Sequence, residues 1–186
     1  RQMCIRDRCR TILPAPIVPR QARPTIPRLN PLSRAVMALR AGDHLPSFNL
    51  LDQDGEQRSS DELAGRPLVL FFYPKDDTSG CTAQACQFRD LLPRFKRSKA
   101  LVLGISPQDE KSKARFAAKN DLNFPILADI DAKICDKYGV WQEKSMYGRK
   151  YMGIVRTTYL IDAQGRVAHR WDKVKVPGHA DEVLEA

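Results

Sequence analysis

Cys81 and Cys86 are the residues whose type and spacing best support chemistry in this chain. Cys81 follows a loop over residues 74–80 that carries Pro, Thr and Gly, and it stands where a helical pattern begins. The positive end of a helix dipole stabilises an anion, and the thiolate anion is the nucleophilic form of cysteine. The sequence therefore predicts that Cys81 is a reactive thiol.

The two cysteines are five positions apart. On a continuous helix this spacing gives a rise of about 7.5 Å and a rotation of about 500°, so the side chains point to different faces. A disulfide requires Cα atoms within about 7 Å of each other and facing Cβ atoms. The pair can therefore close only when the first turns of the helix unwind, as expected of a working dithiol. A static disulfide or two core thiols remain alternatives.

The histidines and the cysteine at position 135 are not expected to form a metal site with Cys81 and Cys86. A zinc site needs further ligands at metal-binding spacing, and His44, His169 and His179 are isolated from the cysteines. Cys135, on an apolar helix face, is expected to be a buried core thiol, with a role as an alternative second cysteine left open. We expect no metal and no other cofactor.

The elements that must position the cysteines follow from the hydrophobic pattern. The apolar run 68–73 predicts a buried strand before the loop, and apolar residues at helical spacing predict a helix after it, which Pro93 should break or kink. The other elements expected are a hairpin around Asp54-Gly55, a short helix from Ser60 to Gly65, strands over 101–106, 124–127, 156–161 and 167–171, helices over 109–120 and 132–138, and a final helix from His179 that is cut short where the sequence ends. This order predicts an α/β fold with a mixed central sheet flanked by helices on both faces.

Residues 1–36 differ in composition from the rest of the chain. They contain six prolines and eight of the 31 basic residues, but one of the 22 acidic residues. We interpret them as a disordered, basic tail that derives from an artefact or upstream read-through rather than from targeting, followed by one domain over residues 37–186. The remaining 23 basic and 21 acidic residues leave that domain close to neutral, so nucleic-acid binding by it is not expected.

The sequence also bears on the compartment. No apolar run approaches the roughly 18–20 residues of a membrane span, and residues 1–36 lack the apolar block of a secretory signal. Five cysteines form an odd set, unlike the disulfide framework of a small secreted protein. A reducing, cytoplasmic location is expected, and an organellar one only if the tail is a genuine targeting segment.

The chain resembles the peroxiredoxins at the motif Pro74-x-x-x-Thr78-x-x-Cys81. It is similar to their atypical two-cysteine subfamily, called bacterioferritin comigratory protein or peroxiredoxin Q, over the run CTAQACxFRD that begins at Cys81. The likeness extends from about Leu39 to the end and includes the segments 139–144 and 153–162. It implies a thioredoxin-like fold with an N-terminal β-hairpin.

The resemblance assigns a role to each residue of the motif. Cys81 would be the peroxidatic thiolate that attacks a hydroperoxide and becomes a sulfenic acid. Arg156 would stabilise the thiolate and bind the peroxide, and Thr78 would hydrogen-bond the peroxide. Pro74 would shield the site from water. Gln84, where many relatives carry Glu, would orient Arg156 by hydrogen bonding.

The resemblance also implies the rest of the catalytic cycle. Cys86 would attack the sulfenic acid to give an intramolecular disulfide, which thioredoxin would reduce in a protein that is a monomer or a weak homodimer. A thiol–disulfide oxidoreductase on the same fold is disfavoured because the chain has no C-x-x-C pair. The alternative from another class is a binding or chaperone module that Cys81 and Cys86 switch without turnover.

Several other residues are expected to be structural. Trp141 and Trp171 are expected to pack in the domain, and Asp129 and Asp131 to cap a helix. The loop charges at positions 75–77 are expected to be solvated.

Overall fold

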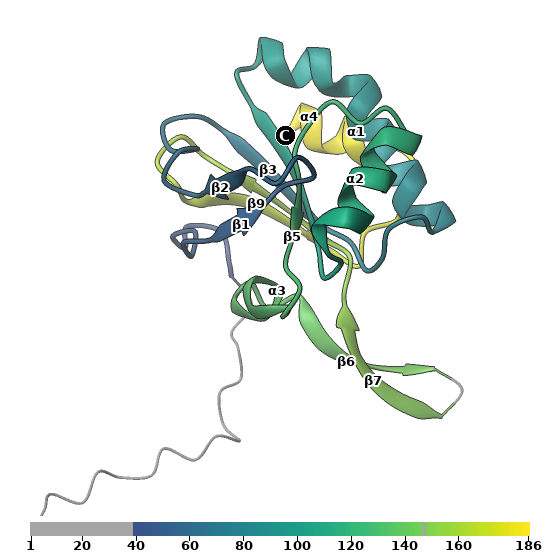
Figure 1. Cartoon of the computed structure of the whole chain (residues 1–186). Helices are drawn as coiled ribbons and strands as arrows, with labels where there is room; N and C mark the ends of the chain where they lie inside the picture. Colours follow the sequence, from purple (N-terminus) through teal and green to yellow (C-terminus); the bar gives the residue numbers. More distant parts are fainter. Residues whose placement is uncertain (1–38, 147) are drawn as a thin grey trace, which may run out of the picture. The chain divides into compact units, whose positions relative to one another are not determined.

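A seven-stranded mixed sheet, in the order β2-β1-β5-β4-β3-β8-β9, forms the centre of the domain in this computed structural model (Figure 1). The structure describes residues 39–146 and 148–186, so the expectations for residues 1–36 lie outside the described residues. The strands of the sheet are β1 (Asn49–Leu51), β2 (Gln57–Ser59), β3 (Leu68–Phe72), β4 (Leu101–Ser106), β5 (Ile126–Ala128), β8 (Thr157–Ile161) and β9 (Val167–Asp172). The remaining elements are the hairpin strands β6 (Trp141–Met146) and β7 (Arg149–Ile154) and the helices α1 (Ser79–Arg97), α2 (Glu110–Lys119), α3 (Lys133–Lys137) and α4 (His179–Glu185). The mixed α/β fold expected from the sequence is confirmed.

Strand β3 divides the interior into two cores because it is buried on both faces. It pairs parallel with β4 and antiparallel with β8. Alternate side chains of a strand point to opposite faces of a sheet. Leu68, Leu70 and Phe72 therefore join one core with α3, and Val69, Phe71 and Tyr73 join the other with α1, α2 and α4.

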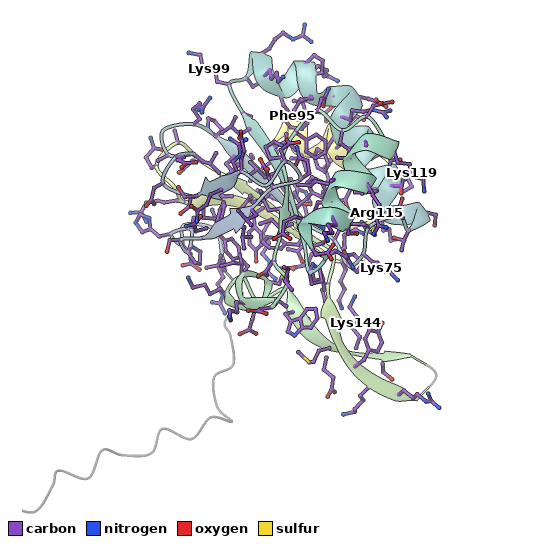
Figure 2. All side chains as sticks on the ribbon, viewed as in Figure 1. Lys75, Phe95, Lys99, Arg115, Lys119 and Lys144 are labelled. Carbon is purple, nitrogen blue, oxygen red and sulfur yellow. The ribbon has the colours of Figure 1, made fainter. Side chains whose placement is uncertain are left out.

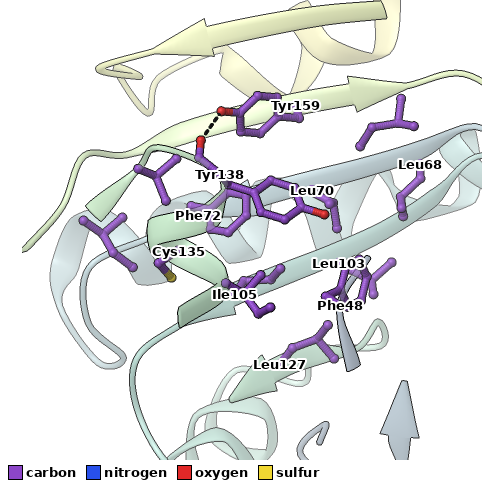
Figure 3. Packing of buried hydrophobic residues seen from close by; sticks show 14 of the residues in the cluster. Phe48, Leu68, Leu70, Phe72, Leu103, Ile105, Leu127, Cys135, Tyr138 and Tyr159 are labelled. Atoms are coloured by element: carbon purple, nitrogen blue, oxygen red, sulfur yellow. Dashed lines mark hydrogen bonds between the residues drawn. The ribbon is translucent and has the colours of Figure 1, made fainter. Parts of the chain in front are cut away.

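The core on the α3 side is shown in Figure 3, where the aromatic rings of Phe72, Tyr138 and Tyr159 lie together. The Tyr159 hydroxyl donates a hydrogen bond of 2.7 Å to the Tyr138 carbonyl, which satisfies a polar group in this apolar layer. The opposite core is built on α1. Its face carries Ala85, Phe88, Leu92 and Phe95, all buried, as the helical spacing predicts.

Helix α1 runs unbroken through Pro93, so of the break or kink expected at this residue the break is wrong. Proline removes one intrahelical hydrogen bond to the Arg89 carbonyl. Leu92 and Phe95 on either side are buried in the core and hold the helix in place. Pro93 itself is exposed, which leaves the unpaired carbonyl region accessible to water.

Two further segments differ from the sequence predictions. Residues 60–65 form successive turns rather than a helix, because their hydrogen bonds, such as Leu63 N to Ser60 O, span three residues and end at Gly65 with φ 84°. The β6–β7 hairpin was not predicted, and it extends from the body of the domain (Figure 1). Over the described residues, no helix combines the length and the apolar character that a membrane crossing requires.

Candidate active site

Cys81 lies in the first turn of α1 and is almost completely buried, with 1% of its surface exposed. Thr78 is the N-cap residue of this helix. The first turn of α1 contains no acidic residue. The thiolate of Cys81 would therefore be the negative group that the N-terminal end of the helix dipole stabilises.

Arg156 supplies the cation at this thiol. Its Nη2 donates a hydrogen bond of 3.3 Å to Cys81 Sγ. The arginine lies between β7 and β8, and its carbonyl accepts a hydrogen bond of 3.0 Å from Val174 N, which fixes the backbone. A Cβ at Gly80 would lie 3.4 Å from Nη2, an ordinary van der Waals contact, so the guanidinium packs close to the backbone of the first turn of α1. The sheet thus brings together two residues that are 75 positions apart.

Gln84 lies one turn after Cys81 and is fully buried. Its Oε1 accepts a hydrogen bond from Arg156 Nη1, so the guanidinium is held between the amide and the thiol. Gln84 Nε2 has no hydrogen-bond partner among the described residues. The Gln84 amide therefore acts as a hydrogen-bond acceptor for Arg156. Because the amide is neutral, it does not offset the positive charge of the guanidinium.

The loop between β3 and α1 carries the remaining residues of the motif. Thr78 is exposed, and its hydroxyl donates a hydrogen bond of 3.2 Å to the Lys75 carbonyl. This bond uses the hydroxyl proton and leaves the oxygen free to accept a hydrogen bond from a ligand. Pro74 is half-buried directly after β3, at the start of the same loop.

The other described thiols differ in accessibility. Cys86 is half-buried on α1, and Cys81, Cys86 and Cys135 are all free. Cys135 is fully buried in the core on the α3 face, whereas Cys81 lies in the core on the α1 face. Burial raises the pKa of Cys135, with the Asp129 carboxylate acting in the same direction. The sheet therefore separates Cys135 from Cys81.

Sequence reasoning did not identify Lys144 as part of this site. Lys144 belongs to β6 (Figure 2), and its Nζ donates a hydrogen bond to the Ile154 carbonyl, two residues before Arg156. Burial lowers the pKa of Lys144, and so does the charge of Arg156, while Cys81 opposes them. Lys144 is thus a second cation near the thiol.

The expectation that Asp76 is a solvated loop charge is wrong. Asp76 is 4% exposed and forms an ion pair with Lys113 of α2, which is fully buried. The sequence did contain a sign of this pair. Lys113 precedes Phe116 and Ala117 by three and four positions, on the buried face of α2, and a lysine there needs an acidic partner.

Over the described ranges 39–146 and 148–186, no group of three or more His, Cys, Asp or Glu residues is arranged to hold a metal ion. The candidate site is composed of two thiols, a half-buried arginine with its amide partner, and a loop hydroxyl.

Comparisons with known proteins agree on the family. The model of the AhpC/TSA family matches residues 41–170. The putative peroxiredoxin bcp of Coxiella burnetii is 45% identical over 148 residues, which cover 80% of this chain and 98% of that protein. Peroxiredoxin Bcp of Escherichia coli K12 is 46% identical over 146 residues, which cover 78% of this chain and 94% of that protein.

Solved structures give the same result. The bacterioferritin comigratory protein of Xanthomonas campestris, studied for its alkyl peroxide reduction activity, matches with a TM-score of 0.72 and 42% identity, covering 74% of this chain and 88% of that chain. A cysteine mutant of Xylella fastidiosa PrxQ matches with a TM-score of 0.76 and 38% identity, covering 79% of this chain and 94% of that chain. The chain therefore belongs to the AhpC/TSA family and is a peroxiredoxin of the Bcp, or peroxiredoxin Q, type, a thiol-dependent peroxidase that takes a peroxide substrate and a thiol reductant.

Proposed function

We propose that this peroxiredoxin reduces hydrogen peroxide and organic hydroperoxides with Cys81 as the peroxidatic cysteine and Cys86 as the resolving cysteine. The observation that carries the proposal is the hydrogen bond of 3.3 Å from Arg156 Nη2 to Cys81 Sγ at the start of α1. A guanidinium keeps its charge at all relevant pH values, so it favours the thiolate. The alkyl peroxide activity described for the Xanthomonas campestris relative supports the organic substrates.

In the first step the Cys81 thiolate attacks the terminal oxygen of the peroxide. An S–O bond forms and the O–O bond breaks, so the sulfur is oxidised to sulfenic acid and the peroxide is reduced to water or an alcohol after the leaving oxygen is protonated. Arg156 binds the peroxide oxygens by charge-assisted hydrogen bonds. Thr78 accepts the hydrogen of the peroxide, and Pro74 limits the access of water.

In the second step Cys86 attacks the sulfur of the sulfenic acid. The S–S bond forms, the S–O bond breaks, and the oxygen leaves as water. Both cysteines belong to one unbroken helix, so the first turns of α1 must unwind before their sulfurs can meet. Two thiols of thioredoxin then reduce the disulfide by exchange through a mixed disulfide.

The setting of the protein is part of the proposal. The three described cysteines are free thiols, which supports a reducing, cytoplasmic compartment. Four large hydrophobic side chains are exposed among the described residues, namely Leu51, Ile130, Tyr151 and Met152, and this modest apolar surface supports a monomer or weak homodimer. The near-neutral charge after residue 36 argues against nucleic acid as a partner.

The test is a thiol count on the reduced protein before and after one equivalent of hydrogen peroxide, with peptide mapping. We expect the loss of two thiols within seconds and a Cys81–Cys86 linkage. Cys81→Ser should lose none on that timescale, and Cys86→Ser should accumulate a sulfenic acid that dimedone labels.

Cys135→Ala is the matched control, because it removes a buried thiol on the other face of the sheet, and it should react like the wild type. A linkage through Cys135, or retention of all thiols, would overturn the assignment. Repeated turnover with thioredoxin and its reductase separates an enzyme from a redox switch, since a switch consumes one equivalent of peroxide only. Turnover with glutathione but not with thioredoxin would contradict thioredoxin as the reductant.

A further inference from the structure

The loop between β3 and α1 contains one acidic residue that turns inward. Asp76 is buried, while its neighbours Lys75 and Asp77 are exposed. Asp77 has a φ of 57°, the left-handed conformation that allows the chain to turn sharply after Asp76. Asp76 lies midway between Pro74 and Thr78, in the middle of the loop that carries both residues.

Both oxygens of the Asp76 carboxylate are occupied. Lys113 Nζ lies 3.0 Å from Oδ1 and 3.2 Å from Oδ2. The Tyr73 hydroxyl donates a hydrogen bond of 2.7 Å to Oδ1, and Ser112 Oγ donates one of 2.8 Å to Oδ2. The carboxylate is therefore bound from the end of β3 and from the first turn of α2.

The same lysine extends the network to β4. Its Nζ donates to the hydroxyl of Ser106, the last residue of β4, and lies 5.0 Å from the centre of the Tyr73 ring. Gln108 Oε1 accepts hydrogen bonds from Ser106 Oγ at 2.8 Å and from Asp76 N at 3.2 Å. The loop is thus bound to β3, β4 and α2, and none of these bonds involves α1.

A buried ion pair is a poor choice if stability alone is required. Desolvation of two charges offsets most of their attraction, and apolar residues of similar size are often as stable, whereas removing one partner leaves an unpaired buried charge. Burial lowers the pKa of Lys113 and the Asp76 carboxylate opposes that shift. What such a pair provides is one defined arrangement of the groups that it joins.

We propose that the Asp76–Lys113 ion pair is a positioning device that fixes the loop over residues 74–78, and with it Thr78 and Pro74, through bonds to β3, β4 and α2 that add to the bond from Thr82 N of α1 to the Thr78 carbonyl. The loop keeps its place while the first turns of α1 unwind to form the disulfide. This inference rests on the proposed roles of Cys81 and Cys86. It assigns the pair to the oxidation of Cys81 and not to the resolution by Cys86.

The test measures the two steps separately in Lys113→Met. Rapid quenching in a Cys86→Ser background gives the rate constant for oxidation of Cys81 by peroxide, and the protein with both cysteines gives the rate of disulfide formation. We expect oxidation to slow by about tenfold to a hundredfold, because small misplacements of substrate-binding groups have effects of this size. At peroxide concentrations high enough that oxidation of Cys81 is not limiting, the first-order rate constant of disulfide formation should keep its wild-type value.

Lys119→Met is the matched control. Lys119 also joins α2 to this loop, through an ion pair of 2.9 Å with Asp77, but its side chain is 68% exposed (Figure 2). Exposed pairs of this kind contribute little, so both rates should remain unchanged. The comparison separates a buried positioning contact from any contact between the same two elements.

The single variant contains an unpaired buried carboxylate and can fail to fold. Asp76→Asn combined with Lys113→Met removes both charges and the bond between loop and helix, and it should fold and show the same selective loss of oxidation rate. A wild-type oxidation rate in either folded variant, or equal slowing of both steps, would overturn the proposal. If the wild-type protein itself does not lose its Cys81 thiol to peroxide, the proposed function fails instead.

Discussion

At Cys81 a single guanidinium contacts two partners of different kinds. Arg156 donates through Nη2 to the Cys81 sulfur and through Nη1 to the Gln84 amide oxygen. The Gln84 amide fixes the plane of the guanidinium, and the positive charge of the guanidinium lies beside the Cys81 sulfur. Because the fork of an arginine is rigid, losing one partner misaligns the bond to the other.

Gln84→Met tests this orientation. Methionine is similar in size but is a poor acceptor, so we expect the rate constant for Cys81 oxidation to fall by about tenfold or more. Gln84→Glu keeps an acceptor and should retain more of the rate. Gln87→Met is the control, because Gln87 Oε1 lacks a hydrogen-bond partner in the described structure. The measurement is stopped-flow oxidation by hydrogen peroxide, and an unaffected Gln84→Met would refute the orienting role.

At the residue scale, the sequence was sufficient to identify the motif. It was not sufficient to identify the distant residues that hold the motif loop in place. Cys81, Thr78 and Pro74 follow each other closely in the chain, so the resemblance to the peroxiredoxin motif could assign them to one site. Lys113 lies far from them in sequence, and it reaches Asp76 only because parallel pairing of β3 and β4 places α2 beside the loop. Local patterns do not encode such a contact, although a lysine on an apolar helix face marks that a partner exists.

At the scale of elements, the contact of α1 with the sheet depends on one glycine. Phe71 of β3 stacks on Phe88 of α1 with ring centres 4.8 Å apart. On β4, a Cβ at Gly104 would lie 2.7 Å from Phe71 Cζ and 3.1 Å from Ile126 Cγ2. The absence of a side chain at Gly104 therefore leaves the space in which the Phe71 ring lies against α1.

Gly104→Ala should lower the free energy of unfolding by about 1–3 kcal/mol, as overpacked cores do. Urea unfolding followed by circular dichroism measures the change. Adding Phe71→Leu should recover part of the loss caused by Gly104→Ala, since the smaller side chain removes the clash, and the double-mutant cycle gives the coupling. Equal stability of Gly104→Ala and wild type would show that the ring shifts without cost.

Helix α4 contributes a pH-dependent contact to the same core. His179 is buried, its Nε2 lies 2.9 Å from Thr158 Oγ1, and its ring packs edge-on against Phe88. Burial lowers its pKa from the ordinary value of 6.5; Glu182 opposes this shift, and Arg156 acts in the same direction as burial.

The unfolded chain therefore takes up a proton near pH 6.5, before the folded protein does, so the unfolding free energy should fall as pH drops below that value and level off below the folded pKa. Urea unfolding at a series of pH values between 8 and 5 measures this decrease. It should be on the order of 1.4 kcal/mol for each unit by which the pKa of His179 differs between the folded and unfolded states. His179→Gln should lack this decrease. His44→Gln, at an exposed position, should retain it, and a decrease in both variants would contradict the assignment.

Most elements were predictable because one periodicity dominates each of them. The buried runs of β3 and β4 and the apolar face of α1 leave little choice of structure. The β6–β7 hairpin exposes apolar residues such as Tyr151 and Met152. Its sequence therefore lacks the alternation of apolar and polar residues that marks a strand with one buried face. Pro93 misled the prediction because tertiary packing of Leu92 and Phe95 offsets a local preference.

At the scale of the whole molecule, the sheet separates the face that would change in the proposed cycle from the face that would not. Cys81 and Cys86 belong to α1, whereas α3 and the core shown in Figure 3 contact neither thiol. Strand β3 serves both cores and pairs with β4 and β8. Disulfide formation is therefore expected to open one end of one helix and leave the sheet intact.

Hydrogen exchange measures this directly. After one equivalent of peroxide, amides in residues 79–90 should lose protection, while those of β3 and β4 keep theirs. Cys86→Ser forms no intramolecular disulfide and should keep α1 protected. Loss of protection throughout the sheet would show instead that oxidation unfolds the domain as a whole.

Because α1 is intact in the reduced protein, its first turns must open before a disulfide can form, and this opening takes time. In the proposed cycle, the sulfenic acid of Cys81 would stay beside Arg156 until these turns open, and in that time a second peroxide could oxidise it irreversibly to sulfinic acid. Gly80 has a lower helix propensity than alanine and would therefore shorten that interval. The peroxide concentration at which the enzyme inactivates itself is then the concentration at which the second oxidation becomes as fast as the opening of α1. Tolerance to oxidant would in this way be a property of helix stability, and substitutions that change the stability of the first turn should shift the peroxide concentration at which the enzyme inactivates itself.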